Sequence, residues 1–271
     1  MAKNPAEAGI ERLLLLGCGK MGGALLDGWL SAGFAPQNVA VLDPAPSERL
    51  QALASEGLVL NPEALPAATV ALIAVKPQRM AEALPRLAPL AGGACLFVSI
   101  AAGTPLAAFE RALPASPIVR AMPNTPAAVG HAITALIGNG LAGAREIAMA
   151  ETLMAAVGAT VRLSAEDQMD AVTAVSGSGP AYVFHLIEAL AAAGEAEGLA
   201  PDLARRLARA TVEGAGALSA RAAEDAATLR ENVTSPGGTT AAGLGVLMDE
   251  LPDLMRRTVA AAAARGRALG E

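Results

Sequence analysis

The sequence contains very few aromatic residues: Phe, Trp and Tyr make up 2% of its 271 residues, although 53% are hydrophobic. A protein with so few rings cannot rely on stacking them against bases, as single-strand-binding proteins do. The formal net charge is −6 and no basic run occurs, whereas nucleic acids and anionic membranes attract clustered positive charge. We therefore expect no nucleic-acid or membrane partner, and a core built from Ala, Leu and Val.

Cysteine and histidine are also scarce, with two residues of each. Cys18 and Cys95 lie far apart in apolar segments, so no disulfide framework is indicated and a reducing cytoplasm is the simplest location. With His131 and His185 as the histidines, the sequence shows no metal-ligand cluster, and we expect no metal site. The early apolar run at 13–16 is too short for a signal-peptide core or a membrane span.

The first half of the chain alternates between short apolar runs and segments with helical periodicity. The apolar runs stop at turn-forming residues, while the segments between them place apolar residues three to four apart. This alternation predicts βαβ units and a parallel sheet. The expected strands are 12–17, 38–43, 69–75, 94–103, 117–124 and 132–138, and the expected helices between the first three are 21–33 and 47–57.

From about Ser164 the strand-like runs disappear and Ala-rich helical patterns take over. The fold class is therefore α/β: an N-terminal Rossmann-like doubly wound sheet in 1–163, followed by an all-α dimerisation domain in 164–271. A long helix, or two, is interrupted at "SGSGP" (176–180), and another helix begins near Pro201. Because so small a helical domain carries many apolar faces, we expect another subunit to cover them.

Gly17, Gly19 and Gly22 have G-x-G-x-x-G spacing between the first expected strand and the first expected helix. In a dinucleotide-binding unit these glycines permit the tight turn, the close approach of the pyrophosphate and the packing of helix on strand. Asp43 ends the second strand, where a contact with the ribose is expected. The pattern predicts a dinucleotide site, and a nicotinamide is favoured over a flavin because a single such module precedes a helical domain. A purely structural glycine turn is the alternative.

A second glycine-rich segment, "TSPGGTT" (234–240), lies between two expected helices. The start of a helix exposes unpaired N–H groups and the positive end of the dipole, and glycines let a ligand approach the backbone closely. Such a loop can hold a small anion. The alternative is an ordinary helix cap, because Ser and Thr are common capping residues and Pro-Gly is a common turn.

The sequence contains six motifs in a fixed order: "GCGKMGGALLDGW", "AVKPQ", "SIAAG", "RAMPNTPAAVG", "DAVTAVSGSGPAYVF" and "LRENVTSPGGTTAAGL". Together they resemble the pyrroline-5-carboxylate reductase family, from Leu13 to about Leu269; the last two motifs are specific to it. The resemblance implies reduction of the cyclic imine 1-pyrroline-5-carboxylate to L-proline, with NADPH or NADH as the hydride donor. It also implies an interlocked homodimer, at least, whose dimers often assemble into rings.

The resemblance further implies a set of site residues. The "SPGGTT" loop holds the substrate carboxylate through backbone N–H groups, and the hydroxyl of Thr240, the catalytic residue, lies near the ring nitrogen. The implied substrate-binding residues are Glu166, Ser235, Gly237, Gly238, Thr239 and Thr240. The implied cofactor-binding residues are Gly17, Cys18, Gly19, Lys20, Met21, Gly22, Asp43, Asn61, Ala74, Val75, Lys76, Pro77, Ile100, Ala101, Ala102, Thr173 and Asn232.

Several of these positions have simpler explanations. Asn61 can be a turn residue, Lys76 an exposed charge at a strand end, and Glu166 a carboxylate favoured by a helix start. "SGSGP" can be a helix kink. Two other functions also stay open: a β-hydroxyacid dehydrogenase of similar layout, and a nucleotide sensor without turnover. The absence of lysine in "DAVTAVSGSGPAYVF" argues against the first, and the intact "SPGGTT" argues against the second.

The end of the second strand departs from the family pattern. Asp43 stands where NADPH-preferring members usually have a hydroxyl, amide or arginine, and a carboxylate there favours ribose hydroxyls over a 2′-phosphate. Ser47 and Arg49 follow at a helix start, where a phosphate would be stabilised, and Arg49 could instead pair with Asp43. We expect both cofactors to be used, with NADH used relatively better than is usual for the family.

Overall fold

The structure, a computed structural model, describes residues 4–270. The chain forms two compact units: unit 1 runs up to Ser178 and resumes at Ala262, and unit 2 is Gly179–Ala261. The sequence led us to expect a domain boundary after residue 163. The division between the compact units falls later, because the short helical turns after the last strand belong to unit 1. The expected functional boundary stays a prediction.

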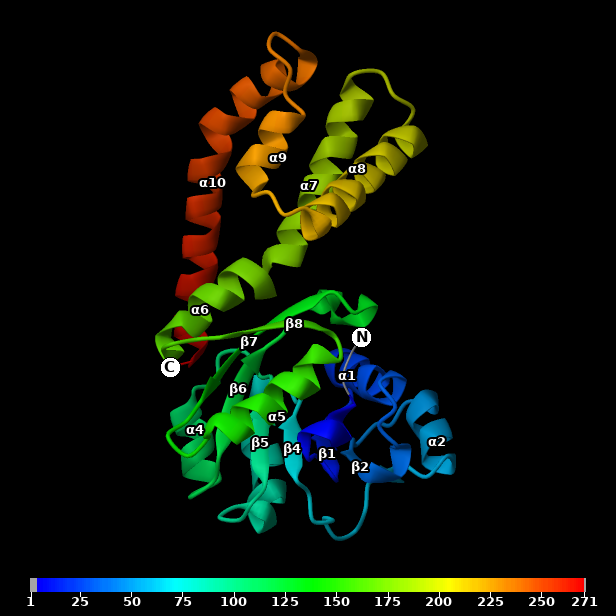
Figure 1. The fold of residues 1–271 in the computed structure, drawn as a ribbon, viewed down its shortest axis with the longest axis vertical. Helices are drawn as coiled ribbons and strands as arrows, with labels where there is room; N and C mark the ends of the chain where they lie inside the picture. Colours follow the sequence, from blue (N-terminus) through cyan, green and yellow to red (C-terminus); the bar gives the residue numbers. More distant parts are fainter. Residues whose placement is uncertain (1–3, 271) are drawn as a thin grey trace. The chain divides into compact units, whose positions relative to one another are not determined.

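Within the described residues, unit 1 contains the strands β1 (Leu13–Leu16), β2 (Val39–Leu42), β3 (Val59–Leu60), β4 (Val70–Ile73), β5 (Leu96–Ser99), β6 (Ile118–Met122), β7 (Ala132–Gly138) and β8 (Gly158–Arg162). They form one sheet in the order β3-β2-β1-β4-β5-β6-β7-β8 (Figure 1). The first six follow the 3-2-1-4-5-6 order of doubly wound dinucleotide-binding sheets. The expected Rossmann-like fold is therefore confirmed, and each expected strand is present.

The expectation of a wholly parallel sheet is wrong at one pair of strands. β7 runs antiparallel to β6, with Arg120 opposite Ile137. Residues 123–131 connect these strands and contain the short helix η5 (Thr125–Val129). A parallel pair needs a crossover of about a dozen residues or more, so a connection this short returns the chain in the opposite direction.

Two edge strands have no clear signal in the sequence. β3 consists of the two residues Val59 and Leu60. β8 carries half-buried and exposed residues in place of an apolar run. Edge strands are commonly short or polar, since this discourages pairing with other chains, and the same properties make them hard to recognise.

Helices cover both faces of the sheet, which explains why β1, β2 and β4 are apolar and buried throughout. Leu13 and Leu15 pack toward α1 (Lys20–Ser31), α2 (Glu48–Ser55) and α5 (Ala144–Ala155). Leu14 and Leu16 pack toward the other face. That face is covered by α3 (Met80–Ala83), η4 (Leu84–Leu90) and α4 (Leu106–Ala112).

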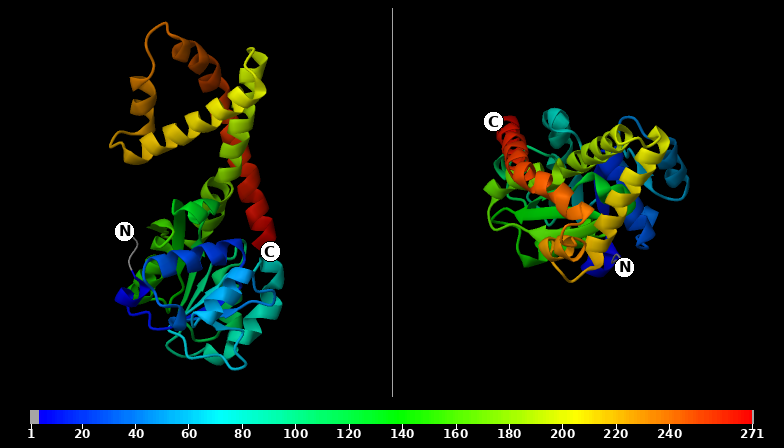
Figure 2. Two further views of the ribbon diagram at one scale, coloured as in Figure 1. Left: turned by 90° about the vertical axis from the view of Figure 1, so that its right-hand side faces the viewer. Right: turned by 90° about the horizontal axis from the view of Figure 1, so that it is seen from above.

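Short helical segments complete unit 1: η1 (Pro5–Ala8), η2 (Pro36–Asn38), η3 (Pro77–Arg79), η6 (Glu166–Gln168), α6 (Met169–Val172) and η7 (Thr173–Gly177). The last turns of the C-terminal helix α10 (Thr239–Gly270) also belong to it. A Cβ on Gly266 would stand 3.0 Å from Asp170 Oδ1, and a Cβ on Gly103 would stand 3.5 Å from Leu269 Cβ. Figure 2 shows this red end of α10 beside the sheet-containing unit.

Unit 2 consists of α7 (Gly179–Ala196), α8 (Pro201–Arg221), α9 (Ala226–Asn232) and the first part of α10. α7 and α8 pack side by side as a helical hairpin (Figure 1), and Pro201 occupies the first turn of α8 as expected. α10 is a single helix of 32 residues that includes Pro252. No helix in residues 4–270 is long and apolar enough to cross a membrane.

In a single chain, unit 2 exposes many large apolar side chains. Its buried residues include the small side chains of Ala191, Ala204 and Ala208. Phe184 is 60% exposed, and the other exposed apolar residues are Val183, Leu186, Leu190, Leu199, Leu203, Leu207, Leu218, Val233, Val246, Leu247, Met248, Leu251 and Leu254. Extended apolar surface of this kind is typical of a protein–protein interface.

Candidate functional site

The first glycine-rich turn has the geometry that a pyrophosphate requires. Gly17 has φ +88°, and a Cβ there would stand 2.9 Å from Val75 Cγ1. A Cβ on Gly22 would stand 2.5 Å from the Gly17 carbonyl oxygen, so the protein itself requires glycine at both positions. A Cβ on Gly19 would meet nothing within 4 Å. This open space at the start of α1 fits a dinucleotide, whose phosphates would use the room.

Asp43 joins the end of β2 to the glycine turn. Its Oδ2 accepts a hydrogen bond from Cys18 N at 2.7 Å, and its Oδ1 accepts one from Ala45 N at 2.9 Å. Asn61 in turn fixes the main chain of Asp43, because Asn61 Oδ1 accepts from Asp43 N at 2.9 Å and Asn61 Nδ2 donates to Asp43 O at 2.8 Å. Asn61 is thus a structural clamp, and its contact with the cofactor stays a prediction.

Cys18, the second residue of the turn, has a half-buried free thiol. Burial raises the pKa of its thiol to about 12, and the carboxylates of Asp43 and Asp27 add to this rise. A neutral thiol is a poor nucleophile. Its main-chain N–H, which holds Asp43, is therefore the group of this residue that shapes the site.

Arg49 lies with a different partner from the one considered above. Its Nε donates to Asp27 Oδ1 at 2.8 Å, so the suggested pairing with Asp43 is wrong in this structure. Ser47 caps α2 by accepting a hydrogen bond from Leu50 N at 3.3 Å. Asp27 and Ser47 line a cavity beside α1 that does not include Asp43.

A first cavity, of about 320 Å³, opens at the carboxyl ends of β1, β2 and β4. In a doubly wound sheet this is where the adenosine half of a dinucleotide lies. The cavity joins the glycine turn to Asp43 and to the segment after β4. Its lining residues are Leu16, Gly17, Gly19, Leu42, Asp43, Pro44, Ala74, Val75, Lys76, Arg79, Glu82, Ala83 and Arg86.

A second cavity, of about 280 Å³, opens at the carboxyl ends of β4, β5 and β6. It brings together Met21, the segment after β4 and the segment after β5, all of which were expected to line the cofactor. Sequence reasoning assigned no role to the turn after β6 or to Gly177, although a Pro-Asn-Thr-Pro turn at a strand end was a usable signal. The lining residues are Met21, Ala74, Val75, Lys76, Pro77, Ile100, Ala101, Ala102, Met122, Pro123, Asn124, Thr125 and Gly177.

The "SGSGP" interruption begins in a π-helical turn, η7. Asn124 Nδ2 donates to Ser176 O at 3.2 Å, which ties this turn to the segment after β6. A Cβ on Gly177 would stand 2.7 Å from Met122 Cε. Short π-helical turns frequently occur at functional sites, and this one forms a wall of the second cavity.

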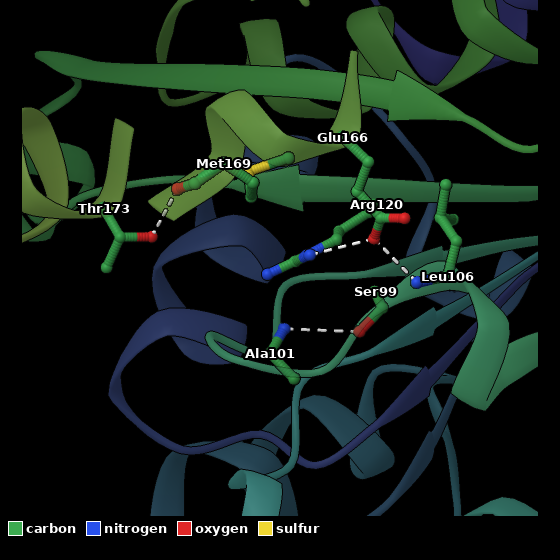
Figure 3. Close-up of polar contacts among 7 residues, drawn as sticks. All are labelled: Ser99, Ala101, Leu106, Arg120, Glu166, Met169 and Thr173. Atoms are coloured by element: carbon green, nitrogen blue, oxygen red, sulfur yellow. Dashed lines mark hydrogen bonds and ion pairs between the residues drawn. The ribbon is translucent and has the colours of Figure 1, made fainter. Parts of the chain in front are cut away.

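Glu166 is engaged by the protein itself. Its Oε1 accepts from Leu106 N at 2.7 Å and from Arg120 Nη1 at 2.9 Å (Figure 3). The Arg120 side chain is 7% exposed and that of Glu166 is 32% exposed. A guanidinium this deeply buried requires a carboxylate partner, so Glu166 has a clear structural role. Its contact with substrate stays a prediction.

Two hydroxyls near this network are directed at the backbone. Ser99 Oγ accepts from Ala101 N at 3.3 Å, at the start of the segment that lines the second cavity (Figure 3). Thr173 Oγ1 donates to Met169 O at 2.9 Å. The expected place of Thr173 at the nicotinamide end stays a prediction.

The "SPGGTT" loop of unit 2 lies at the start of α10, as expected. Gly237 has φ +69°, and Gly238 N donates to Ser235 O at 3.1 Å. A Cβ on Gly238 would stand 2.5 Å from Ser235 Oγ, so the turn needs both glycines. Its exposed residues, together with the last residue of α9, are Asn232, Ser235, Pro236, Gly237, Thr239 and Thr240.

Two family models match the chain. Residues 12–103 match a model described as NADP oxidoreductase, coenzyme F420-dependent. Residues 166–269 match a model described as pyrroline-5-carboxylate reductase dimerisation. The first match covers the glycine turn and both cavity-lining segments after β4 and β5, and the second covers the helical unit with its glycine-rich loop.

Curated relatives and solved structures agree with these matches. The chain is 39% identical over 237 residues to pyrroline-5-carboxylate reductase of Pseudomonas aeruginosa, covering 86% of this chain and 87% of that protein. It is 41% identical over 242 residues to that of Synechocystis, covering 87% and 89%. The structure of the Coxiella burnetii enzyme has a TM-score of 0.90 at 32% identity, covering 96% and 99%.

A further solved structure bears on the cofactor. Pyrroline carboxylate reductase of Plasmodium falciparum, described with NADP bound, has a TM-score of 0.80 at 27% identity and covers 96% of this chain and 98% of that one. The glycine turn and its two cavities have the arrangement of a dinucleotide-binding sheet. The chain belongs to the pyrroline-5-carboxylate reductase family.

Proposed function

We propose that unit 1 binds NAD(P)H along the two cavities at the carboxyl ends of its strands, and that the "SPGGTT" loop binds the substrate carboxylate. The protein is an NAD(P)H-dependent oxidoreductase whose reaction is the reduction of the C=N bond of 1-pyrroline-5-carboxylate to L-proline. The observation that supports these placements most directly is the second cavity, where the segments after β4, β5 and β6 meet the π-helical turn.

The glycine turn holds the middle of the cofactor. The first N–H groups of α1 point toward the open space at Gly19, and the helix dipole favours a negative pyrophosphate there. Both oxygens of Asp43 already accept main-chain N–H groups, and each keeps a further lone pair for a ribose hydroxyl. The adenosine half of the cofactor would then lie in the first cavity and the nicotinamide half in the second.

The bound nicotinamide supplies the hydride that attacks the imine carbon. The chain contributes orientation: Ile100, Ala101 and Met122 give the second cavity apolar walls, and Ser99 and Asn124 fix the backbone around it. The hydride-donating carbon of the nicotinamide and the imine carbon are then held close together. Their reaction becomes effectively intramolecular, which supplies much of the rate enhancement of such enzymes.

The substrate loop contributes charge complementarity. Gly238 N–H already donates to Ser235 O, so the backbone N–H of Thr239, at the positive end of a helix of 32 residues, is the donor that suits a carboxylate. Thr240 Oγ1 lies one residue further and is the hydrogen-bond partner of the ring nitrogen. The glycine-rich loops contain no His or Tyr that could act as a strong general acid. The imine therefore binds in its protonated form, and Thr240 orients it.

The apolar surface of unit 2 supports a homodimer at least, consistent with the dimerisation model that matches this region. The substrate loop is exposed in a single chain, and we infer that the loop of one chain completes the site of its partner; assembly of dimers into a ring extends the same proposal. Sedimentation would show a dimer or larger species as the active form, and an active monomer would overturn this arrangement.

Both cofactors are used, with NADH relatively better than is usual for the family, because the Asp43 carboxylate disfavours a 2′-phosphate. Asp43→Ser should shift the ratio of kcat/KM toward NADPH by about tenfold, equivalent to about 1.4 kcal/mol. An unchanged ratio would show that Asp43 does not meet the ribose. A cytoplasmic location is proposed on the ground that Cys18 and Cys95 are both unpaired thiols.

The direct test of the activity is oxidation of NADH and NADPH by the purified protein with 1-pyrroline-5-carboxylate. We expect oxidation of the nicotinamide to match, mole for mole, the formation of L-proline measured by chromatography. A β-hydroxy acid with the oxidised cofactor serves as the control substrate. No turnover of the imine with either cofactor would refute the function.

A further inference from the structure

The first cavity contains more positive charge than a ribose needs. Its lining includes Lys76, Arg79 and Arg86 against the two carboxylates of Asp43 and Glu82. The adenosine of NADH brings two neutral ribose hydroxyls to this place, whereas that of NADPH brings a phosphate with a charge between −1 and −2. Three cations lining one cavity suit the second ligand.

Neither carboxylate cancels this charge in full. Both oxygens of Asp43 accept main-chain hydrogen bonds, from Cys18 and Ala45, so part of its negative charge is already compensated. Glu82 pairs with Arg79, three residues earlier, through Nε at 2.8 Å and Nη2 at 3.1 Å. The two side chains are 57% and 71% exposed, and ion pairs in water contribute little to stability. Arg79 can therefore exchange Glu82 for a more highly charged partner.

We propose that Arg79 recognises the 2′-phosphate of NADPH. Its guanidinium breaks the ion pair with Glu82 and binds the phosphate, and Lys76 and Arg86 add to the positive potential of the cavity. This inference rests on the proposed binding of the cofactor along unit 1, and it names the feature that lets a chain with Asp43 at the end of β2 still accept NADPH. A guanidinium can donate two parallel hydrogen bonds to a phosphate, which replace the two it gives to Glu82.

The arginine that the sequence suggested, Arg49, does not line the first cavity. Arg49 follows Asp43 closely in the chain, but its guanidinium is held by Asp27, which lines the cavity beside α1. Arg79 follows β4 instead of β2 and lines the first cavity. Arg49 is therefore a matched control: an exposed, ion-paired arginine near the same turn but outside the first cavity.

The test is calorimetric binding of three nucleotides to the full chain: adenosine 5′-monophosphate, adenosine 2′,5′-bisphosphate and adenosine 3′,5′-bisphosphate. We expect Arg79→Gln to raise the Kd of the 2′,5′-bisphosphate about tenfold and to change the Kd of the monophosphate by no more than about twofold. This is the difference expected from the loss of one bidentate contact with a phosphate. Arg49→Gln should change neither. Glu82→Gln, which removes the competing carboxylate, should tighten the 2′,5′-bisphosphate in the wild-type background and have no effect in the Arg79→Gln background.

The inference would be overturned if Arg79→Gln changed the affinity for all three nucleotides equally, or for none. It would also be overturned by an equal loss of affinity for the 2′,5′- and 3′,5′-bisphosphates, because that would indicate a general anion site. With turnover, the ratio of kcat/KM for NADPH to that for NADH should fall about tenfold in Arg79→Gln. Nucleotide binding as expected without reduction of the imine would refute the proposed reaction and leave this inference standing.

Discussion

The guanidinium of Arg120 and the carboxylate of Glu166 form an ion pair at 2.9 Å between the middle of the sheet and the start of the helical region. Arg120 lies on β6 opposite Ser99 on β5, and Glu166 Oε1 also accepts the N–H of Leu106 at the start of α4. The segment after β5 is thus fixed at its first residues by Ser99 and at its far end by Glu166. The buried charge of Arg120 therefore holds, through Glu166, the far end of a cavity-lining segment.

Removing that charge should loosen the segment and the fold together. Arg120→Gln leaves Glu166 half-buried without its cation, and we expect the free energy of unfolding to fall by about 2 kcal/mol. The KM for NAD(P)H should rise more than kcat falls. Urea denaturation and steady-state kinetics measure the two effects. Arg162→Gln, which breaks the exposed pair with Glu151, is the control and should change stability little; equal effects of both variants would refute the argument.

The glycine turn allows two alanine substitutions with opposite consequences. Gly19→Ala places its methyl group in open space, so the melting temperature should stay unchanged while the Kd for NAD(P)H rises at least tenfold, because the methyl occupies the place of the pyrophosphate. Gly22→Ala drives a methyl group into the Gly17 carbonyl and should destabilise the fold by about 2 kcal/mol or more. Unchanged cofactor affinity in Gly19→Ala would show that the phosphates bind elsewhere.

Thr240→Val keeps the shape of the side chain and removes the hydroxyl. We expect turnover to fall by one to two orders of magnitude, about 1.4–2.8 kcal/mol of transition-state stabilisation, with the fold intact. Thr258→Val, further along the same helix and bonded to Leu254 O, is the control and should retain wild-type turnover. Steady-state kinetics and circular dichroism check both variants, and wild-type rates in Thr240→Val would exclude its catalytic role.

Thr134 on β7 is fully buried, and its hydroxyl has no hydrogen-bond partner within residues 4–270. A buried hydroxyl without a partner costs free energy, so Thr134→Val should raise the free energy of unfolding by about 1 kcal/mol. Thr152→Val removes a hydroxyl that does donate to Ala148 O and should bring no such gain. Urea denaturation measures this difference. A loss of stability in Thr134→Val would contradict the prediction and would show that the hydroxyl has a hydrogen-bond partner such as a bound water.

The two thiols should make stability fall at alkaline pH. Burial raises the pKa of Cys18 and of Cys95 to about 12, whereas an unfolded thiol ionises near about 8.5. Between these values the unfolded chain loses thiol protons and the folded chain keeps them, so the free energy of unfolding decreases as pH rises. Urea denaturation from pH 8 to pH 10 should show a shallower decrease in the Cys18→Ala/Cys95→Ala variant, and parallel curves would contradict the raised pKa values.

The sequence predicted what depends on local pattern. Short apolar runs located β1, β2, β4, β5, β6 and β7, and the glycine-rich segments were correctly placed at the starts of α1 and α10. β3 and β8 were missed because a two-residue strand and a polar edge strand have no apolar periodicity. β7 runs antiparallel because the connection between β6 and β7 is short. That length can be read from the sequence, but the βαβ pattern of the earlier strands favoured a parallel arrangement.

The pairing of charges could not be read from the sequence at all. Arg120 and Glu166 are 46 residues apart, and no spacing rule connects two elements that meet only in the folded sheet. The same limit applies to Arg49 and Arg79: proximity to Asp43 along the chain favoured the first, whereas the strand order β2-β1-β4 brings the second into the cavity that Asp43 lines.

The position of the last turns of α10 has a consequence for how the chain is built. Because residues from Ala262 onward pack into unit 1, the helical unit is topologically an insertion within the nucleotide-binding unit. A ribosome completes the sheet well before it has synthesised the helix turns that lie against Gly103 and Asp170. The nucleotide-binding unit therefore finishes folding only after the helical unit has emerged, and closing it requires contacts of long sequence separation, which are the slow ones to form.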